Sequence, residues 1–394
     1  MFFRFLICVY LCASVASADL LIRDVAIVDV AAGRTKAPLS ILIRGGKITA
    51  IGVALRAAAP VRVIDGRGKF VIPGLWDMHV HLAAREQLPV YVKYGVTGVR
   101  DMGSDYDRVN LWRGEMEKRT LLGPHIETCG PALDGVASTG VRMVRNPEEA
   151  RAVFNQLDDE SVDFICVGPE LPRDAYFALT ERARKYYSVV AGDVPASVSA
   201  LEAVEARQKS IDHMPAILLA CSSEEKRLRQ AYLQALDRGD QIAAGDVEAA
   251  ALDSYDLPKA AVLFQRMALF ETRFVPALAG SIPKFTTLLR DMQRAGVVIL
   301  AGSDGGKPGE SLHQELELLV AAGLRPAQAL RSATLDAAKY VGAASLGSVE
   351  VGNAADLVIL DADPLVDIRN TRKISGVVLG GRYLIPRKIF TSER

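Results

Sequence analysis

Two histidines lie one residue apart at the end of an apolar segment. The segment VIPGLWDMHVHL contains His79 and His81, in a chain that has only five histidines. Residues i and i+2 of a β-strand project from the same face, so the two imidazoles can reach one ion together. Imidazole nitrogen suits Zn²⁺ or a similar transition metal. The alternative is a pair of core histidines bonded to the backbone, but the spacing favours a metal site.

Three further polar residues each close an apolar run. Asp193 ends SVVAGD, His213 ends SIDH, and Asp304 ends VVILAGSD. An unpaired buried carboxylate is costly, which favours a metal or base role for Asp304 over a simple capping role. Such a carboxylate could bind a metal and also accept a proton from the attacking water.

The elements that would position these residues alternate between strand and helix. Over residues 73–345, short β-rich runs such as GVTGVRD, SVDFICVG and GVVILAGSD are each followed by a helical pattern. This alternation and length predict an α/β fold, a (β/α)8 TIM-like barrel, in which the carboxyl ends of the strands meet on one face. One helix is expected in SLHQELELLVAAG, with Ser311 as its N-cap and Gln314 completing a capping box.

Both ends of the chain have a different pattern. Residues 19–72 and 346–394 contain short apolar or alternating runs, with Gly-Gly dipeptides at 45–46 and 380–381 that suit tight hairpins. Each end is too short to bury a good core alone. We therefore expect one small β-sandwich domain built from both ends, beside the barrel domain of residues 73–345.

The first residues read as a leader. MFFRFLICVYLCASVASA combines a basic residue, a short apolar run and small residues, the pattern of a signal peptide cleaved after Ala18. The mature protein is therefore expected to be secreted or periplasmic, without a membrane span. Cleavage would leave Cys129, Cys166 and Cys221. Three thiols cannot make a disulfide framework, so at least one must stay free or act as a ligand.

Composition excludes some partners. Lys plus Arg and Asp plus Glu number 47 each, and half of the residues are hydrophobic. A nucleic-acid binder usually carries a basic excess or patch, so nucleic acid is not expected as a partner. The expected partner is a small-molecule or dipeptide substrate, and association with copies of the same chain stays open.

Several long motifs carry a family resemblance. VIPGLWDMHVHL, YGVTGVRDMGS, VSALEAVEARQKSIDHM, GVVILAGSDGG, SLHQELELLVAAGL and GNAADLVILDADPLVDIRNTRKISGVVLGGR occur in this order. Together they resemble the amidohydrolase superfamily, in its secreted prolidase and imidazolonepropionase-like branch. The resemblance implies a barrel with one or two divalent metals per chain, with zinc as the expected ion, a β-sandwich from both termini, and hydrolysis of amide-type bonds by metal-activated water.

The resemblance also implies roles for individual residues. His79 and His81 match the family's first-strand pair, His213 the sixth-strand histidine, and Asp304 the eighth-strand aspartate. His313, in SLHQEL, matches a recurrent histidine that is not usually a ligand, and a structural role is favoured for it. His125 matches no family position.

Two positions depart from the family pattern. Cys166 stands where binuclear members have a carboxylated lysine, and Asp193 stands where they have the fifth-strand histidine. A thiolate is an excellent zinc ligand and an aspartate an acceptable one. Two losses from one centre are also what a decaying active site would show.

Three hypotheses follow. In the first, His79, His81 and Asp304 hold one metal, while Cys166, Asp193 and His213 complete the site or bind a second metal. In the second, a single metal is bound, Cys166 is an apolar filler, and Asp193 or His213 moves protons. In the third, the protein is an exported pseudoenzyme that binds a ligand or partner.

Retention of the polar residues His79, His81, His213 and Asp304 favours an active enzyme. The expected reaction is metal-dependent hydrolysis of a small amide, such as an Xaa-Pro-like dipeptide or an N-acyl amino acid. Asp304 would accept the proton of the water and pass it to the leaving amine. His213 would bind a second metal or stabilise the oxyanion.

Overall fold

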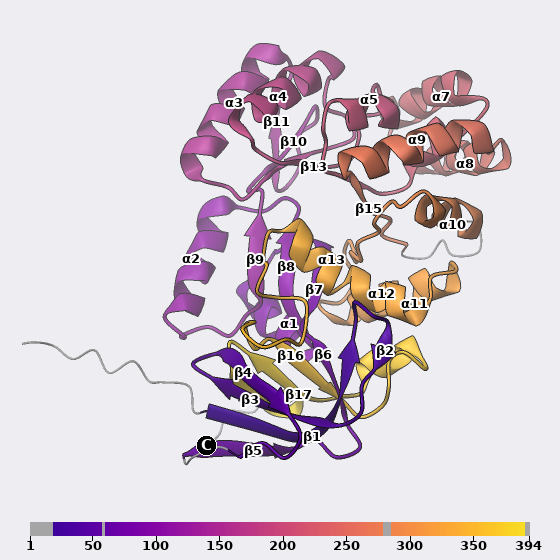
Figure 1. The fold of residues 1–394 in the computed structure, drawn as a ribbon. Helices are drawn as coiled ribbons and strands as arrows, with labels where there is room; N and C mark the ends of the chain where they lie inside the picture. The colour runs from indigo at the N-terminus through magenta and orange to yellow at the C-terminus, as the bar shows by residue number, and fades with distance from the viewer. Residues whose placement is uncertain (1–18, 57–59, 279–284, 391–394) are drawn as a thin grey trace, which may run out of the picture.

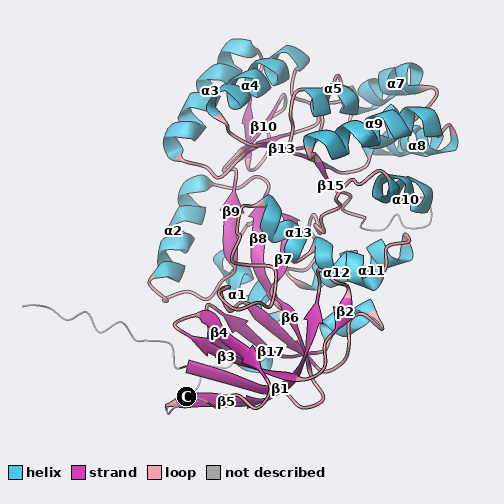
Figure 2. Cartoon of the chain, in the orientation of Figure 1, coloured by secondary structure: helices cyan, strands magenta, loops and turns pink. Residues whose placement is uncertain are grey.

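The structure is a computed structural model that describes residues 19–56, 60–278 and 285–390 (Figure 1). The expected leader, residues 1–18, lies outside the described residues. A β-rich part occupies one end of the molecule, and a larger part of strands and helices occupies the rest (Figure 2).

Both ends of the chain join one nine-stranded sheet, in the order β18-β17-β16-β6-β1-β3-β4, with β2 and β5 paired to β1. Its N-terminal strands are β1 (Asp19–Asp29), β2 (Arg34–Thr35), β3 (Leu39–Arg44), β4 (Lys47–Gly52), β5 (Val61–Asp65) and β6 (Phe70–Pro73). Its C-terminal strands are β16 (Leu357–Leu360), β17 (Ile374–Leu379) and β18 (Arg382–Leu384). Strand β16 runs antiparallel to β6. The two ends of the chain therefore fold together in one sheet.

A small core holds the two ends together. Leu20, Ile22 and Ile41 from the N-terminal strands cluster with Leu357 and Val378 from the C-terminal strands, and all five are buried. Burial of such side chains contributes roughly 1.5–3 kcal/mol each. Neither end could bury these residues without the other, which explains why the sheet draws on both.

The two Gly-Gly dipeptides form the expected hairpin turns. Gly45, Gly46, Gly380 and Gly381 all have positive φ, between 55° and 80°, a conformation that only glycine adopts readily. They connect β3 to β4 and β17 to β18, both antiparallel pairs. The turns also meet, because a Cβ added at Gly381 would lie 2.6 Å from the Cα of Gly46.

The rest of the chain is α/β, with parallel strands in three groups: β7-β8-β9, β11-β10-β12-β13 and β14-β15. The strands are β7 (Leu75–Val80), β8 (Val96–Asp101), β9 (His125–Thr128), β10 (Ala132–Asp134), β11 (Val141–Met143), β12 (Ile165–Val167), β13 (Val190–Gly192), β14 (Ser210–Asp212) and β15 (Arg273–Val275). Together they form a curled arrangement with helices on its outer side (Figure 1).

The helices connect these strands in sequence order. They are α1 (Leu88–Lys93), α2 (Tyr106–Glu117), α3 (Pro147–Glu160), α4 (Arg173–Tyr186), α5 (Ala200–Glu205), α6 (Pro215–Ala220), α7 (Glu225–Asp237), α8 (Gln241–Asp253), α9 (Leu257–Phe270), α10 (Thr286–Arg294), α11 (Glu310–Ala321), α12 (Pro326–Ser332) and α13 (Leu335–Tyr340). Short 3₁₀ turns cover Arg85–Gln87, Ile368–Arg372 and Pro386–Lys388. Each long helix buries one apolar face, such as Val153, Phe154 and Leu157 of α3.

One expected strand is not regular. The run GVVILAGSD carries no strand of its own and pairs with β15 only at a bridge between Phe274 and Ile299. Its backbone nevertheless forms hydrogen bonds with strands on both sides. Leu300 N donates to Phe274 O at 2.8 Å, and Met78 N donates to Ala301 O at 2.9 Å. The segment therefore lies between β15 and β7, and it places Asp304 beside the end of β7.

One expected helix cap is wrong. Helix α11 begins at Glu310, and its N-cap is Gly309 rather than Ser311. Gly309 has φ +71° and follows Gly305 and Gly306, which also have positive φ. This glycine-rich turn starts the helix two residues earlier than expected, so Ser311 lies inside the helix.

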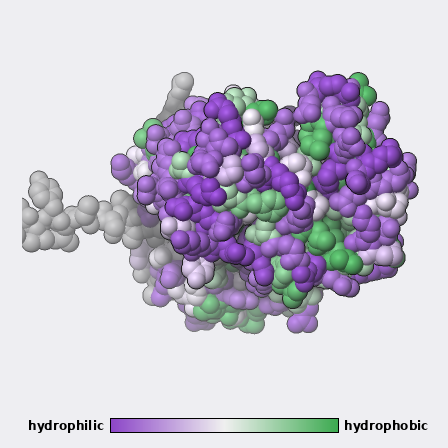
Figure 3. Space-filling model, turned by 90° about the horizontal axis from the view of Figure 1, so that it is seen from above, coloured by the Kyte–Doolittle hydropathy of each residue, from purple (hydrophilic) through white to green (hydrophobic). Residues whose placement is uncertain are grey.

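The outer surface is largely polar. Seen from above, hydrophilic residues cover most of the face, and hydrophobic residues form smaller patches between them (Figure 3). Within the described ranges, no helix has both the length and the apolar character needed to cross a bilayer.

Candidate metal centre

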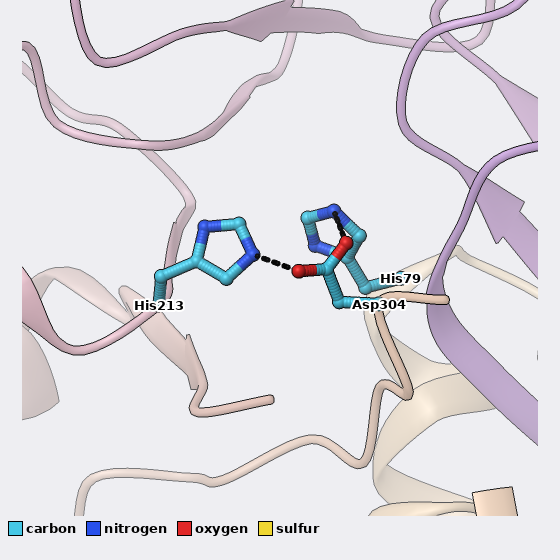
Figure 4. Close-up of side chains that lie close together, drawn as sticks. All are labelled: His79, His213 and Asp304. Carbon is cyan, nitrogen blue, oxygen red and sulfur yellow. Dashed lines mark hydrogen bonds and ion pairs between the residues drawn. The ribbon is translucent and has the colours of Figure 1, made fainter. Parts of the chain in front are cut away.

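Three side chains from distant parts of the chain meet at one point (Figure 4). His79 comes from β7, His213 directly follows β14, and Asp304 follows the segment beside β15. His79 Nε2 lies 3.4 Å from Asp304 Oδ1, and His213 Nε2 lies 3.1 Å from Asp304 Oδ2. One ligand atom from each residue can be chosen so that all three lie within 4.8 Å of one another. The sequence prediction that these residues lie together is consistent with this geometry.

Two of the three residues have unusual backbone conformations. His213 has φ +65° and Asp304 has φ +43°, a region that non-glycine residues rarely occupy. Hydrogen bonds hold both in place, from His213 N to Val275 O at 2.8 Å and from Asp304 N to His79 O at 2.9 Å. Strained backbone of this kind clusters at functional sites, where the surrounding structure maintains it.

Each of the two imidazoles is anchored through Nδ1 by a carboxylate. His79 Nδ1 lies 2.8 Å from Asp212 Oδ2, and His213 Nδ1 lies 2.8 Å from Asp193 Oδ1. A carboxylate at Nδ1 fixes the proton there and turns Nε2 toward the opposite side of the ring. Both Nε2 atoms consequently face Asp304.

The charges of the site shift the pKa of each group. Burial disfavours the imidazolium of His213, but Asp193 and Asp304 outweigh burial and raise its pKa to about 11. Hydrogen bonds from His213 and His81 hold the pKa of Asp304 well below its ordinary range, although burial opposes them. Burial lowers the pKa of His79, despite its bond to Asp212. In the absence of a metal, the proton on His213 therefore faces an ionised Asp304.

His81 lies at the edge of this centre. Its Nε2 is 3.5 Å from Asp304 Oδ1, and half of its side chain is exposed. Its ring centroid lies 5.3 Å from that of His79. The first-strand pair therefore meets the same carboxylate, but among the described residues the group that can converge on one ion is His79, His213 and Asp304.

The prediction that Cys166 is a metal ligand needs correction. Cys166 forms a disulfide with Cys129, and the two Cα atoms are 5.7 Å apart. A disulfide sulfur is not a thiolate, so it lacks the donor that binds zinc. The sequence reasoning did not pair these two cysteines, because spacing alone does not show that β12 and the end of β9 are neighbours. Cys221 is free and buried.

Asp193 contacts the centre indirectly. Its bond to His213 Nδ1 makes it the anchor of an imidazole, and it is not part of the group that can converge on one ion. The remaining histidines serve elsewhere. His313 is buried and bonded to Thr371 Oγ1 and Tyr94 O, each at 2.9 Å. His125 lies 2.7 Å from Asp356 in the terminal sheet.

Sequence reasoning missed two residues of this site. Arg100 and Asp212 form an ion pair of 2.6 Å whose side chains are completely buried, and Asp212 in turn bonds to His79. Burial alone would raise the pKa of Asp212, but Arg100 and His79 outweigh it, and the pKa is lowered. The available signal was a charged residue within each of two apolar runs, GVTGVRD and SIDH, since such charges are rarely buried without a partner.

The residues present fit a divalent transition metal. Two imidazole nitrogens and one carboxylate oxygen form a common donor set of catalytic zinc sites, which keep one further position open for water or substrate. The anchored Nδ1 atoms add the outer hydrogen bonds that such sites usually have.

This chain is similar to known proteins over most of its length. The amidohydrolase family model matches residues 70–384. Imidazolonepropionase of Vibrio vulnificus strain CMCP6 is 25% identical over 420 residues, covering 93% of this chain and 98% of that protein. A solved structure of a Xaa-Pro dipeptidase with methionine bound in its active site has TM-score 0.71 and 22% identity, covering 93% of this chain and all of the other. A candidate prolidase from Bifidobacterium longum has TM-score 0.70 and 23% identity, over 94% and 95% of the two chains.

The two solved structures share the fold of this chain, and the family match extends from β6 through the candidate metal centre to β18. The chain belongs to the amidohydrolase family.

Proposed function

We propose that the protein is a metal-dependent hydrolase that cleaves a small amide by means of an activated water. The observation that carries this proposal is the convergence of His79 Nε2, His213 Nε2 and the Asp304 carboxylate. Each imidazole is also held through its Nδ1 by a carboxylate. Zinc is the proposed ion because of the nitrogen-rich donor set.

Each residue has a defined task. A bound divalent ion would lower the pKa of a water molecule and polarise the scissile carbonyl. His79 and His213 hold the ion through Nε2. Asp304 is ionised at neutral pH, so one of its oxygens can accept the proton of the attacking water and deliver it to the leaving amine. His81, half exposed beside Asp304, lies where it can contact substrate or the ion.

A single ion is proposed. Cys166 is held in a disulfide, and Asp193 uses an oxygen to anchor His213. Both positions at which the chain departs from the family pattern are thus engaged in other contacts. These contacts support the mononuclear hypothesis over the binuclear one.

The proposed substrate is a dipeptide of the Xaa-Pro type or an N-acyl amino acid. The likeness to a Xaa-Pro dipeptidase supports it. A small open hollow also lies beside Asp193 and is lined mainly by apolar residues. Its lining residues include Val194, Leu219 and Tyr232.

Location and architecture form part of the same proposal. Export is supported by the leader-like first residues and by the disulfide, because disulfides persist mainly in oxidising compartments.

A closed eight-stranded barrel is supported by the segment before Asp304, which forms backbone hydrogen bonds with both β15 and β7. A β-sandwich made by the two ends is supported by their shared core.

The test is metal analysis together with substitution of Asp304. Purified protein should hold about one zinc per chain, and Asp304→Asn should lower hydrolysis of an Xaa-Pro and N-acyl panel by at least about a hundredfold. The matched control is Asp246→Asn, which removes an exposed carboxylate of α8 and should leave both values unchanged. Fully folded protein that binds no added metal and cleaves nothing would contradict the proposal and leave the binding-protein hypothesis.

A further inference from the structure

Arg100 is a fully buried cation that links three parts of the interior. Its Nε donates to Met78 O at 2.7 Å, its Nη1 to Ser210 Oγ at 2.8 Å, and its Nη2 to Asp212 Oδ2 at 2.6 Å. Met78 is the residue before His79 in β7. Arg100 itself lies in β8, and Ser210 and Asp212 lie in β14. The guanidinium therefore joins the paired strands β7 and β8 to β14, which pairs with neither of them.

Both carboxylate oxygens of Asp212 are used. Oδ2 accepts hydrogen bonds from Arg100 Nη2 and His79 Nδ1. Oδ1 accepts a hydrogen bond from Ser210 Oγ at 2.7 Å. The next residue along the chain is His213. One side chain thus contacts the first imidazole directly and fixes the strand end from which the second projects.

Stability alone is a poor explanation for this pair. Removing two charges from water costs several kcal/mol per ion, and apolar residues of similar volume often replace a buried ion pair without loss of stability. An ion pair in this place provides polar contacts to the metal centre that apolar side chains cannot provide. It supplies a carboxylate at His79 Nδ1 and a donor to the backbone carbonyl just before His79.

We propose that Arg100 and Asp212 are positioning residues for the metal centre. Arg100 holds the Asp212 carboxylate in place, and Asp212 orients His79 so that Nε2 faces the ion at the spacing set by His213. This inference rests on the proposed metal-dependent function and goes beyond it. Neither residue contacts the ion or the substrate, and both act through the imidazoles.

The proposal predicts weaker metal binding when the pair is altered. Asp212→Asn keeps the size of the side chain, but its amide cannot accept from both His79 and Arg100 as the carboxylate does. Loss of such outer hydrogen bonds typically lowers metal affinity about 10–100-fold. Arg100→Lys keeps the charge but lacks the planar fork that reaches Met78 O and Asp212 together, so it should also bind metal more weakly.

The test measures affinity for Zn²⁺ by competition with a chromophoric chelator, and the visible absorption of Co²⁺ bound in place of zinc. Asp212→Asn should lower zinc affinity at least tenfold and change the cobalt spectrum. The matched control is Asp356→Asn, which removes a buried carboxylate next to β16 that accepts hydrogen bonds from His125 of β9 and from Gly380 N. The control should keep the wild-type affinity and spectrum even where its thermal stability falls.

Outcomes separate the two proposals. Unchanged affinity and spectrum in a folded Asp212→Asn protein would overturn the positioning role and leave the proposed function intact. Wild-type protein that binds neither Zn²⁺ nor Co²⁺ would overturn both. If Asp212→Asn does not fold, Ser210→Ala removes only the hydroxyl between Arg100 and Asp212. It should then lower zinc affinity about fivefold, the effect of one hydrogen bond, and no change would overturn the role.

Discussion

At the scale of single residues, the site is defined by how each imidazole is held. Asp212 anchors His79 and Asp193 anchors His213, so both rings present the same nitrogen to Asp304. Asp193, which stands where the family resemblance implies a fifth-strand histidine, thus has a structural role in this chain. It supports His213, a proposed ligand, and its short side chain reaches His213 Nδ1 without entering the candidate centre.

This arrangement predicts a pH dependence of metal binding. The pKa of His213 is raised to about 11 in the metal-free protein, so a metal must displace its proton at neutral pH. Proton and metal compete for Nε2, and apparent zinc affinity should therefore rise with pH, by about tenfold per unit between about pH 6 and pH 8. Chelator competition across this range measures the slope. His125→Asn, which removes an imidazole of β9 away from the candidate centre, should keep this slope, and a flat profile would contradict the prediction.

At the scale of elements, the connection between β13 and β14 sets the spacing of Asp193 and His213. Helix α5 starts there with a capping box, in which Ser199 Oγ accepts from Glu202 N and the Glu202 side chain accepts from Ser199 N. Glu202 also pairs with Arg173 of α4. The capping signal is local in sequence, whereas the partner on α4 is supplied by the fold.

This connection predicts a second pH effect. The hydrogen bond from Arg173, opposed by burial, lowers the pKa of Glu202 to about 2 from the ordinary 4.5. A lowered carboxyl pKa stabilises the fold above pH 4.5, and this contribution is lost as pH falls toward 2. Because the pair is largely exposed, the loss should be below about 1 kcal/mol. In urea unfolding, Glu202→Gln should lose less free energy of unfolding at acid pH than the wild type does. Asp246→Asn should match the wild type. An identical pH profile in Glu202→Gln would contradict this assignment.

At the scale of the whole molecule, a covalent link joins two groups of strands that share no ladder. Cys129 follows β9 of the first group, and Cys166 lies in β12 of the second. A cross-link stabilises mainly by limiting the conformations of the unfolded chain, and the effect grows with the logarithm of the length of the loop that it closes. The disulfide and the shared terminal core therefore stabilise different parts of the molecule.

The disulfide predicts a stability change without a change in metal binding. Replacing Cys129 and Cys166 together by serine should lower the free energy of unfolding by about 3–4 kcal/mol, measured by urea denaturation, and leave zinc affinity unchanged. Denatured mature protein without reductant should expose one reactive thiol, that of Cys221, and three after reduction. Three thiols before reduction would contradict the pairing and return Cys166 to the group of candidate ligands.

The sequence by itself determined the local features and the residue types. Strand and helix alternation indicated the α/β class, Gly-Gly dipeptides marked both hairpins, and the apolar runs ending in His79, His213 and Asp304 marked the site. These signals are local because backbone propensity and side-chain periodicity are local. Tertiary structure decided the rest: that Cys166 meets Cys129, that Asp193 supports His213 and that Arg100 reaches Asp212. Such contacts join residues far apart in the chain, and their geometry depends on how distant strands come together, which no short segment encodes.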